Sequence, residues 1–235
     1  MNEVVFDIET GPLTKKEVLQ FVDDYPEFDP NQVKFGNTKD PIKKAEKIQA
    51  DEDKHFDQSE AYYRNAVDRA ALSPLTGRVL AIGMVVDGET RILCSGNEAA
   101  DIEAFWKTIA PHDAITHKVI GFNSNRFDLP FLARRSWKLG IDMPQTLFRG
   151  RYINERCIDL MDLWKCGDYQ ATIKLDHLAR FFDCGAKNGS GADFARILEE
   201  DRDAAIAYLE NDIQMTFNCA VKMGVVRARD LTADY

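Results

Sequence analysis

The sequence predicts an α/β fold with a mixed sheet, and the order of its apolar runs is the main reason. Strand-like runs rich in Val, Ile and Phe occupy residues 3–8, 79–86, 90–94 and 118–122. Helix-like amphipathic runs occupy residues 98–109, 128–139, 174–182 and 201–223. Because strands first pair locally and later alternate with helices, we expect one sheet with both antiparallel and parallel neighbours, flanked by helices.

The ends of several elements carry turn signals. Gly11-Pro12 ends the first strand-like run. Asp87-Gly88-Glu89 has the composition of a tight turn between two antiparallel strands. Residues 157–164, CIDLMDLW, are expected to form a last strand that runs into a helix.

Residues 13–74 separate the first strand from the second, and the part from Asp40 to Leu72 is rich in charges of both signs. Asp40 is placed to cap a helix whose first residue is Pro41. The simpler interpretation is a charged, solvated helical insertion within a single domain spanning residues 1–235. A lid over a functional site, or an arm that docks a protein partner, is the alternative, and the sequence does not choose between them.

Composition narrows the class of protein. The five cysteines form no CxxC pair, which favours reduced thiols and a cytoplasmic location. No apolar run is long enough to span a membrane, and no signal peptide precedes the first strand, so no membrane association is expected. The net charge of −9 argues against a broad electrostatic grip on nucleic acid, although a bound metal can supply positive charge beside a phosphate.

The first strand contains two carboxylates in an otherwise apolar run, VVFDIETGP. Asp7 and Glu9 are two residues apart, so their side chains point to the same face of the strand. Two like charges side by side repel, and burial increases that cost. Divalent cations are the obvious compensation, because hard metals bind oxygen ligands.

A second motif, GFNSNRFDLPFL, spans residues 121–132, where a strand ends and a helix begins. Asp128 is placed either as an ordinary helix N-cap or as a site residue at the end of a strand. Asn123 is either a turn residue or part of the same site. Nearby arginines are candidates for phosphate contacts, or are ordinary exposed residues: Arg126, Arg134 and Arg135.

The third motif, YLENDIQMT, lies on the last long helix, where Tyr208 and Asp212 share one face. The apolar stripe of this helix is Ile206, Leu209, Ile213 and Phe217, and the pair lies off it. In isolation the pair is therefore expected on a solvated face. Together with the other two motifs it completes a set of four carboxylates that could hold two Mg²⁺ or Mn²⁺ ions: Asp7, Glu9, Asp128 and Asp212.

The three motifs, FDIET, NxxxFD and YxxxD, resemble those of the DEDD superfamily of 3′–5′ exonucleases. A Tyr four residues before the last Asp is typical of the DEDDy branch. The DEDDh branch has a His five residues before that Asp, where this sequence has Ala207. FDIET and SPLTGRVLAIGMV at 73–85 look most like the proofreading domain of family B DNA polymerases and its stand-alone relatives. The resemblance covers about 1–11 and 73–225, and the chain is too short for a polymerase as well.

The resemblance implies a ribonuclease H-like fold with a mixed five-stranded sheet. It makes Asp7, Glu9, Asp128 and Asp212 the ligands of two divalent cations, and Tyr208 the residue that orients the attacking water. It also implies contacts to the substrate strand from Thr10, Asn123 and Phe127.

The implied function is a metal-dependent 3′–5′ exonuclease that releases nucleoside monophosphates from single-stranded DNA. The preference for DNA rests on the likeness to the polymerase domain. The alternatives are an exoribonuclease with the same chemistry, and a non-catalytic nucleic-acid-binding module on the same fold.

Overall fold

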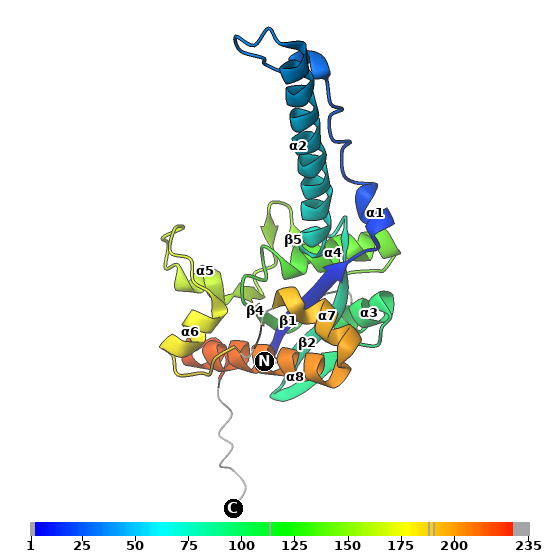
Figure 1. Cartoon of the computed structure of the whole chain (residues 1–235). Coiled ribbons are helices and arrows are strands. Elements are labelled where there is room, and N and C mark those ends of the chain that lie inside the picture. The colour runs from blue at the N-terminus through cyan, green and yellow to red at the C-terminus, as the bar shows by residue number, and fades with distance from the viewer. Residues whose placement is uncertain (1–2, 113, 188, 190, 228–235) are drawn as a thin grey trace, which may run out of the picture. The chain divides into compact units, whose positions relative to one another are not determined.

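The computed structural model describes residues 3–112, 114–187, 189 and 191–227, and the chain divides into two compact units. The first unit comprises Met1–Gly11 and Arg78–Tyr235, and the second comprises Pro12–Gly77. The charged helical insertion expected after the first strand is thus the second unit (Figure 1). No helix among the described residues is long and apolar enough to cross a membrane.

The first unit is built on the expected mixed five-stranded sheet. Its strands are β1 (Glu3–Pro12), β2 (Gly77–Val86), β3 (Glu89–Leu93), β4 (Lys118–Gly121) and β7 (Cys157–Asp159), in the order β3-β2-β1-β4-β7. β2 and β3 pair antiparallel, whereas β1 with β4 and β4 with β7 pair parallel. A separate two-stranded hairpin of β5 (Phe148–Arg149) and β6 (Tyr152–Ile153) was not predicted from the sequence.

The helices of the first unit agree closely with the amphipathic runs in the sequence. They are α3 (Glu98–Ile109), α4 (Asp128–Leu139), α5 (Leu160–Trp164), α6 (Leu175–Phe181), α7 (Phe194–Glu200) and α8 (Arg202–Lys222), with a 3-10 turn, η3 (Gly191–Asp193). The α7 helix was not predicted. Its seven residues are too few for a helical period to stand out.

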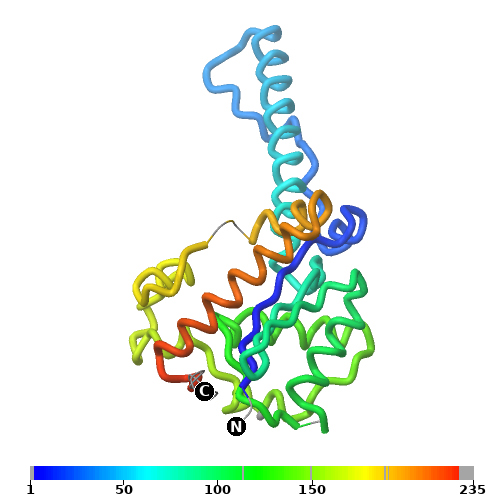
Figure 2. The backbone as a smooth tube through the Cα atoms, turned by 90° about the horizontal axis from the view of Figure 1, so that it is seen from below, coloured from blue at the N-terminus to red at the C-terminus, as the bar shows by residue number. Residues whose placement is uncertain are grey.

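The two faces of the sheet are covered by different helices, and β1 contributes to both. Val4 and Phe6 belong to a core cluster with residues of α3 and α4, and the Phe6 and Phe105 ring centroids are 5.0 Å apart. Val5 belongs to a second cluster with residues of α6 and α8, including Ile213. Because side chains alternate along a strand, Asp7 and Glu9 share the face of Val5, which α8 covers (Figure 2).

A glycine in β2 lets α8 approach this face closely. A Cβ atom on Gly83 would lie 3.0 Å from two side-chain atoms of Leu209 in α8. The absence of a side chain at this position therefore brings the middle of α8, which carries Tyr208 and Asp212, close to the strands.

The second unit consists mainly of α2 (Pro41–Asp68), together with α1 (Lys15–Leu19) and two 3-10 turns, η1 (Pro30–Gln32) and η2 (Ala70–Leu72). The predicted cap is confirmed, since Asp40 accepts a 2.9 Å hydrogen bond from the backbone N–H of Ile42. The extended segment before α2 folds back along it. The Tyr25 backbone N–H donates to the Tyr63 hydroxyl at 2.9 Å, and farther along Lys44 lies 5.4 Å from the Phe35 ring centroid.

Candidate active site

Three carboxylates from β1 and α8 converge on the α8 face of the sheet. One carboxylate oxygen from each of Asp7, Glu9 and Asp212 lies within 4.8 Å of the other two. Glu9 and Asp212 are buried, and Asp7 is half-buried. The first and third sequence motifs thus meet in space, although 203 residues separate the last carboxylate from Glu9 along the chain.

Asp128 lies beside this group and is not the N-cap of α4. The N-cap is Phe127, and Asp128 is the first helical residue. Its Oδ1 accepts a hydrogen bond of 3.1 Å from the backbone N–H of Ile8 in β1. The parallel pairing of β1 with β4 ends at Val5 and Ile120. Ile8 lies beyond this last pair, and the buried Asp128 carboxylate accepts the hydrogen bond from its backbone N–H. The N-cap interpretation is therefore wrong, and the interpretation as a residue beside the strand end stands.

The expectation of a solvated face for Tyr208 and Asp212 is also wrong. Their exposed fractions are 4% and 1%. The reason is that α8 packs against α6 and α7 as well as the sheet, so that it is buried over a wider arc than its apolar stripe suggests. The Asp212 side chain is thereby held in a poorly solvated position beside β1.

A lysine that was not predicted from the sequence completes the group. The Lys187 ammonium forms an ion pair with Asp212 Oδ2 and donates a 3.2 Å hydrogen bond to the Tyr208 hydroxyl. Its backbone N–H donates to Asp176 Oδ1 at 2.9 Å, which ties the loop to α6. The other oxygen, Asp212 Oδ1, is buried and has no hydrogen-bond partner within the described part of the chain. The sequence does indicate that this segment contacts other groups, because the glycine-rich run GAKNGSG at 185–191 is typical of a loop that approaches them closely.

Glycines in that loop bring its backbone against the site. A Cβ atom on Gly189 would lie 3.1 Å from the Tyr208 ring, and one on Gly191 would lie 3.3 Å from Glu9 Oε2. Any side chain at either position would press on a site residue. The two glycines therefore let the loop backbone lie close against Glu9 and Tyr208.

Burial and mutual repulsion raise the pKa values of the carboxyl groups. The pKa of Asp7 rises from 3.8 to about 7, mainly through burial and then through Asp212. The pKa of Glu9 rises from 4.5 to about 9 through burial, Asp7 and Asp212. The Lys187 ammonium opposes both shifts. Burial, followed by Asp7, also raises the pKa of Asp128. A cluster with such shifts favours added positive charge.

The oxygen-only donor set fits a hard divalent cation. Carboxylates are the preferred ligands of Mg²⁺ and Mn²⁺, and Asp212, which belongs to the group with Asp7 and Glu9, has a buried Oδ1 without a hydrogen-bond partner among the described residues. Cations bound by such a group would offset the burial and the mutual repulsion that raise the pKa values.

The raised pKa values predict that the metal-free protein loses stability as pH rises. A folded carboxyl with a raised pKa keeps a proton that the unfolded chain has already released, so unfolding becomes more favourable as pH rises. For Asp7 and Glu9 this window runs from about pH 4 to about pH 9. In EDTA, Glu9→Gln should melt near the wild-type temperature at pH 5 and several degrees above it at pH 8, as measured by calorimetry. A difference that does not grow with pH would contradict the shift of Glu9.

The three predicted substrate-contact residues come from β1 and from the segment between β4 and α4. Thr10 is half-buried on β1. Asn123 has a left-handed backbone with φ of 57°, and its N–H donates to Asp159 Oδ1 at 2.8 Å. Phe127 is partly buried, with its ring centroid 5.5 Å from that of Phe131.

One of the three candidate arginines has a structural role instead. Arg135 is buried and forms two hydrogen bonds with the Glu98 carboxylate, at 2.8 and 2.7 Å. It therefore links α4 to α3 and does not present its guanidinium to a phosphate. Arg126 forms a partly exposed ion pair with Asp162 at 3.3 Å, and Arg134 is exposed.

Comparison with known families gives this geometry its context. Residues 75–235 match a family described as a predicted 3′–5′ exonuclease related to the exonuclease domain of PolB. The chain belongs to this family. The resemblance seen in the motifs is thereby confirmed. The matched region contains Asp128, Lys187, Tyr208 and Asp212, whereas the two carboxylates of β1 lie outside it and join the site through the fold.

Solved structures support the same fold. The family B DNA polymerase from the hyperthermophilic archaeon Pyrobaculum calidifontis matches with a TM-score of 0.59 and 16% identity over 95% of this chain. At this identity the likeness shows the fold alone, and the chain spans 24% of the polymerase chain. No curated protein sequence matches.

Proposed function

We propose that the protein is a metal-dependent 3′–5′ exonuclease that hydrolyses single-stranded DNA to nucleoside monophosphates. The observation that carries the proposal is the convergence of Asp7, Glu9 and Asp212, with one Asp212 oxygen buried and unpartnered within the described residues. Membership of a predicted exonuclease family supports the reaction class. In this proposal residues 1–235 work as one exonuclease domain that carries an insertion at about 13–74.

Four carboxylates would hold two divalent cations, Mg²⁺ or Mn²⁺: Asp7, Glu9, Asp128 and Asp212. When bound, such a pair activates water and stabilises the charge on the leaving oxygen in phosphoryl transfer. The protein contributes an anionic, poorly solvated group of side chains in which those charges interact strongly. Asp128 has a second task, since its hydrogen bond from Ile8 holds β1 in place beside the start of α4.

Tyr208 orients the attacking water as a hydrogen-bond donor in this proposal. Burial, followed by Asp212 and Glu9, raises the pKa of its hydroxyl, so the group keeps its proton at neutral pH. Lys187 donates to the Tyr208 oxygen, and the Tyr208 hydroxyl is hydrogen-bonded to Asp212, so an incoming water would have to share or replace that contact. The Lys187 ammonium also opposes the rise in the pKa values of Asp7 and Glu9 and thus favours their ionised forms.

Residues at the edge of the carboxylate group would position the substrate strand. Thr10 follows Glu9 on β1, and Asn123 and Phe127 lie in the segment between β4 and Asp128, the first residue of α4. The Phe127 ring is only partly buried and so offers a surface on which a base can stack. The choice of DNA rests on the relationship to a DNA polymerase domain.

The decisive test is a gel assay with 5′-labelled single-stranded DNA and RNA of matched sequence, in Mg²⁺, Mn²⁺ or EDTA. We expect a metal-dependent ladder that shortens from the 3′ end, with DNA cut faster, and no ladder from Asp7→Ala. Faster cleavage of RNA would change the substrate and keep the chemistry. No cleavage of either polymer by a protein that still binds metal would overturn the enzyme assignment in favour of a binding module.

Tyr208→Phe should slow hydrolysis by about tenfold to a hundredfold, less than the loss of a carboxylate ligand. The reason is that phenylalanine keeps the ring contacts of the buried tyrosine with Phe194 and removes only the hydroxyl. Single-turnover rates in saturating Mn²⁺ measure the effect. A loss as large as that of Asp212→Asn, with a lower melting temperature, would show that Tyr208 is structural.

A further inference from the structure

The second unit concentrates positive charge at one end of α2. We call this group the lysine tip, and its members are Lys34, Lys39, Lys43, Lys44 and Lys47. Residues 30–48 contain these five lysines and two acidic residues, Asp40 and Glu46. The rest of the unit has five basic and eleven acidic residues, and the whole chain carries a net charge of −9. The tip is thus a local positive surface on an acidic protein.

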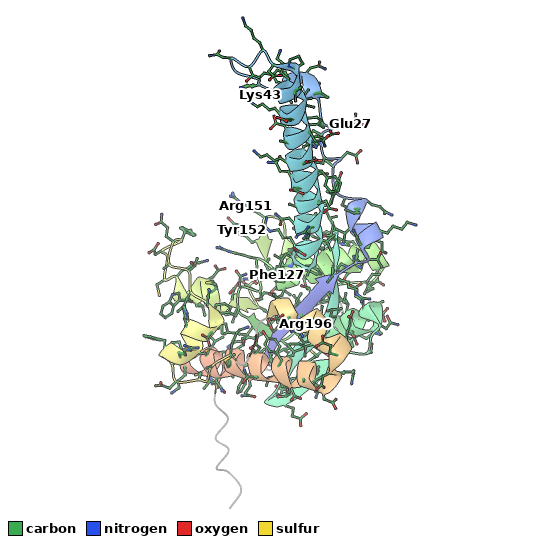
Figure 3. All side chains as sticks on the ribbon, viewed as in Figure 1. Glu27, Lys43, Phe127, Arg151, Tyr152 and Arg196 are labelled. Atoms are coloured by element: carbon green, nitrogen blue, oxygen red, sulfur yellow. The ribbon has the colours of Figure 1, made fainter. Side chains whose placement is uncertain are left out.

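The fold of the unit brings these lysines together. The Lys44 ammonium lies 5.4 Å from the centroid of the Phe35 ring, which joins the loop that carries Lys34 to the first turn of α2. Four of the five lysines are exposed and Lys44 is half-buried. No ion pair links any of the five to a carboxylate of the described chain. Figure 3 shows Lys43 near the N-terminal end of α2, pointing away from the helix.

These positions are unfavourable for the helix itself. Cations near the N-terminus of a helix oppose its macrodipole, and the first turn of α2 contains no acidic residue. Lys43 and Lys47 are also four residues apart, where like charges repel. The Phe35 ring offsets part of this cost at Lys44, whereas within the described chain no ion pair or ring contact is made by Lys39, Lys43 or Lys47. The cluster is better explained by an anionic ligand than by folding.

We propose that the lysine tip binds the phosphate backbone of the single-stranded DNA that the enzyme degrades. The choice of ligand rests on the proposed function. Lysine ammonium groups recognise phosphates as point charges without reading sequence, which suits an enzyme that must accept every sequence. Because the protein is acidic overall, the tip supplies an attraction for long strands that the net charge does not.

The test is the triple variant Lys39→Glu/Lys43→Glu/Lys47→Glu. Binding to a fluorescent 30-nucleotide single strand is measured in EDTA by anisotropy at several salt concentrations. We expect affinity to fall at least about tenfold at 50 mM salt, and the slope of log K against log salt to flatten by about 2, near 0.7 for each lost phosphate contact. Hydrolysis of a trinucleotide should be unchanged, because its two phosphodiesters are taken up by the catalytic site and leave no further backbone for the lysines to bind.

The matched control is Lys15→Glu/Lys16→Glu/Lys54→Glu, which makes the same change in net charge at exposed positions of the same unit. The tip variant should fold as the wild type does, since glutamate near a helix N-terminus is favourable. Equal loss of affinity in both triple variants would overturn the proposal, because it would show a general charge effect.

The remaining outcomes separate this proposal from the proposed function. If the wild type binds the strand through the lysine tip but hydrolyses nothing, the proposal of DNA binding by the tip is supported and the proposal of exonuclease activity is refuted. If the wild type hydrolyses DNA and the tip variant binds the strand as tightly as the wild type, only the proposal of DNA binding by the lysine tip is refuted. Tip-dependent binding to phosphatidylserine vesicles, with no effect on DNA binding, would also overturn the proposal by assigning the lysines to a membrane surface.

Discussion

Asp212→Asn should reduce the exonuclease rate at least about a thousandfold, equivalent to roughly 4 kcal/mol of transition-state stabilisation. Asp212 is one of three converging carboxylates, and the other two, Asp7 and Glu9, come from β1. The substitution therefore removes the ligand that α8 contributes. Asparagine has nearly the same shape and its side-chain oxygen can still accept from Lys187, while the loss of the negative charge removes the repulsion that Asp212 exerts on Asp7 and Glu9. Loss of activity should therefore occur without loss of folding.

Two measurements distinguish this outcome from a damaged fold. The melting temperature in EDTA should not fall, and the rise that Mn²⁺ produces in the wild type should largely disappear. Glu210→Gln is the matched control, because Glu210 lies on the same helix and is exposed. It should keep both the activity and the stabilisation by Mn²⁺. A fully active Asp212→Asn variant would remove the basis of the proposed mechanism.

The elements of the sheet and the long helices could be predicted because each is long and strongly patterned. The residues of α3 and α4 were predicted to the residue, and the strand-to-helix transition at Asp159–Leu160 follows the CIDLMDLW run. The motifs predicted a set of four carboxylates, Asp7, Glu9, Asp128 and Asp212, of which all but Asp128 have oxygens within 4.8 Å of one another. The hairpin of β5 and β6 was not, since two-residue strands leave no alternation to detect.

The wrong predictions concern side chains that are buried or hydrogen-bonded by parts of the chain distant from them in the sequence. Tyr208 and Asp212 lie off the apolar stripe of α8, and only the packing of α6 and α7 against that helix encloses them. Asp128 looked like an N-cap because no local pattern shows that β1 has an N–H to satisfy at Ile8. Lys187 was missed for the same reason, since its partners are 21 and 25 residues away.

Lys187→Met should lower the exonuclease rate by about tenfold to a hundredfold and move the rising limb of the pH–rate profile toward higher pH. Its ammonium pairs with Asp212 and opposes the rise in the pKa values of Asp7 and Glu9. Without that charge both carboxyls hold their protons to higher pH. Because carboxylates bind metal only when ionised, more alkaline conditions or more metal should then be needed for the same rate.

A purely structural lysine would behave differently. Loss of loop anchoring would lower the rate equally at every pH, and excess metal would not restore it. Lys187→Arg should recover part of the rate and the wild-type position of the pH limb, because it keeps the charge that acts on Asp7 and Glu9. Lys138→Met, at an exposed position of α4, should leave both quantities unchanged. Rate profiles from pH 5.5 to 9.5 at two Mn²⁺ concentrations decide between these outcomes, since only an electrostatic role couples the pH shift to the metal requirement.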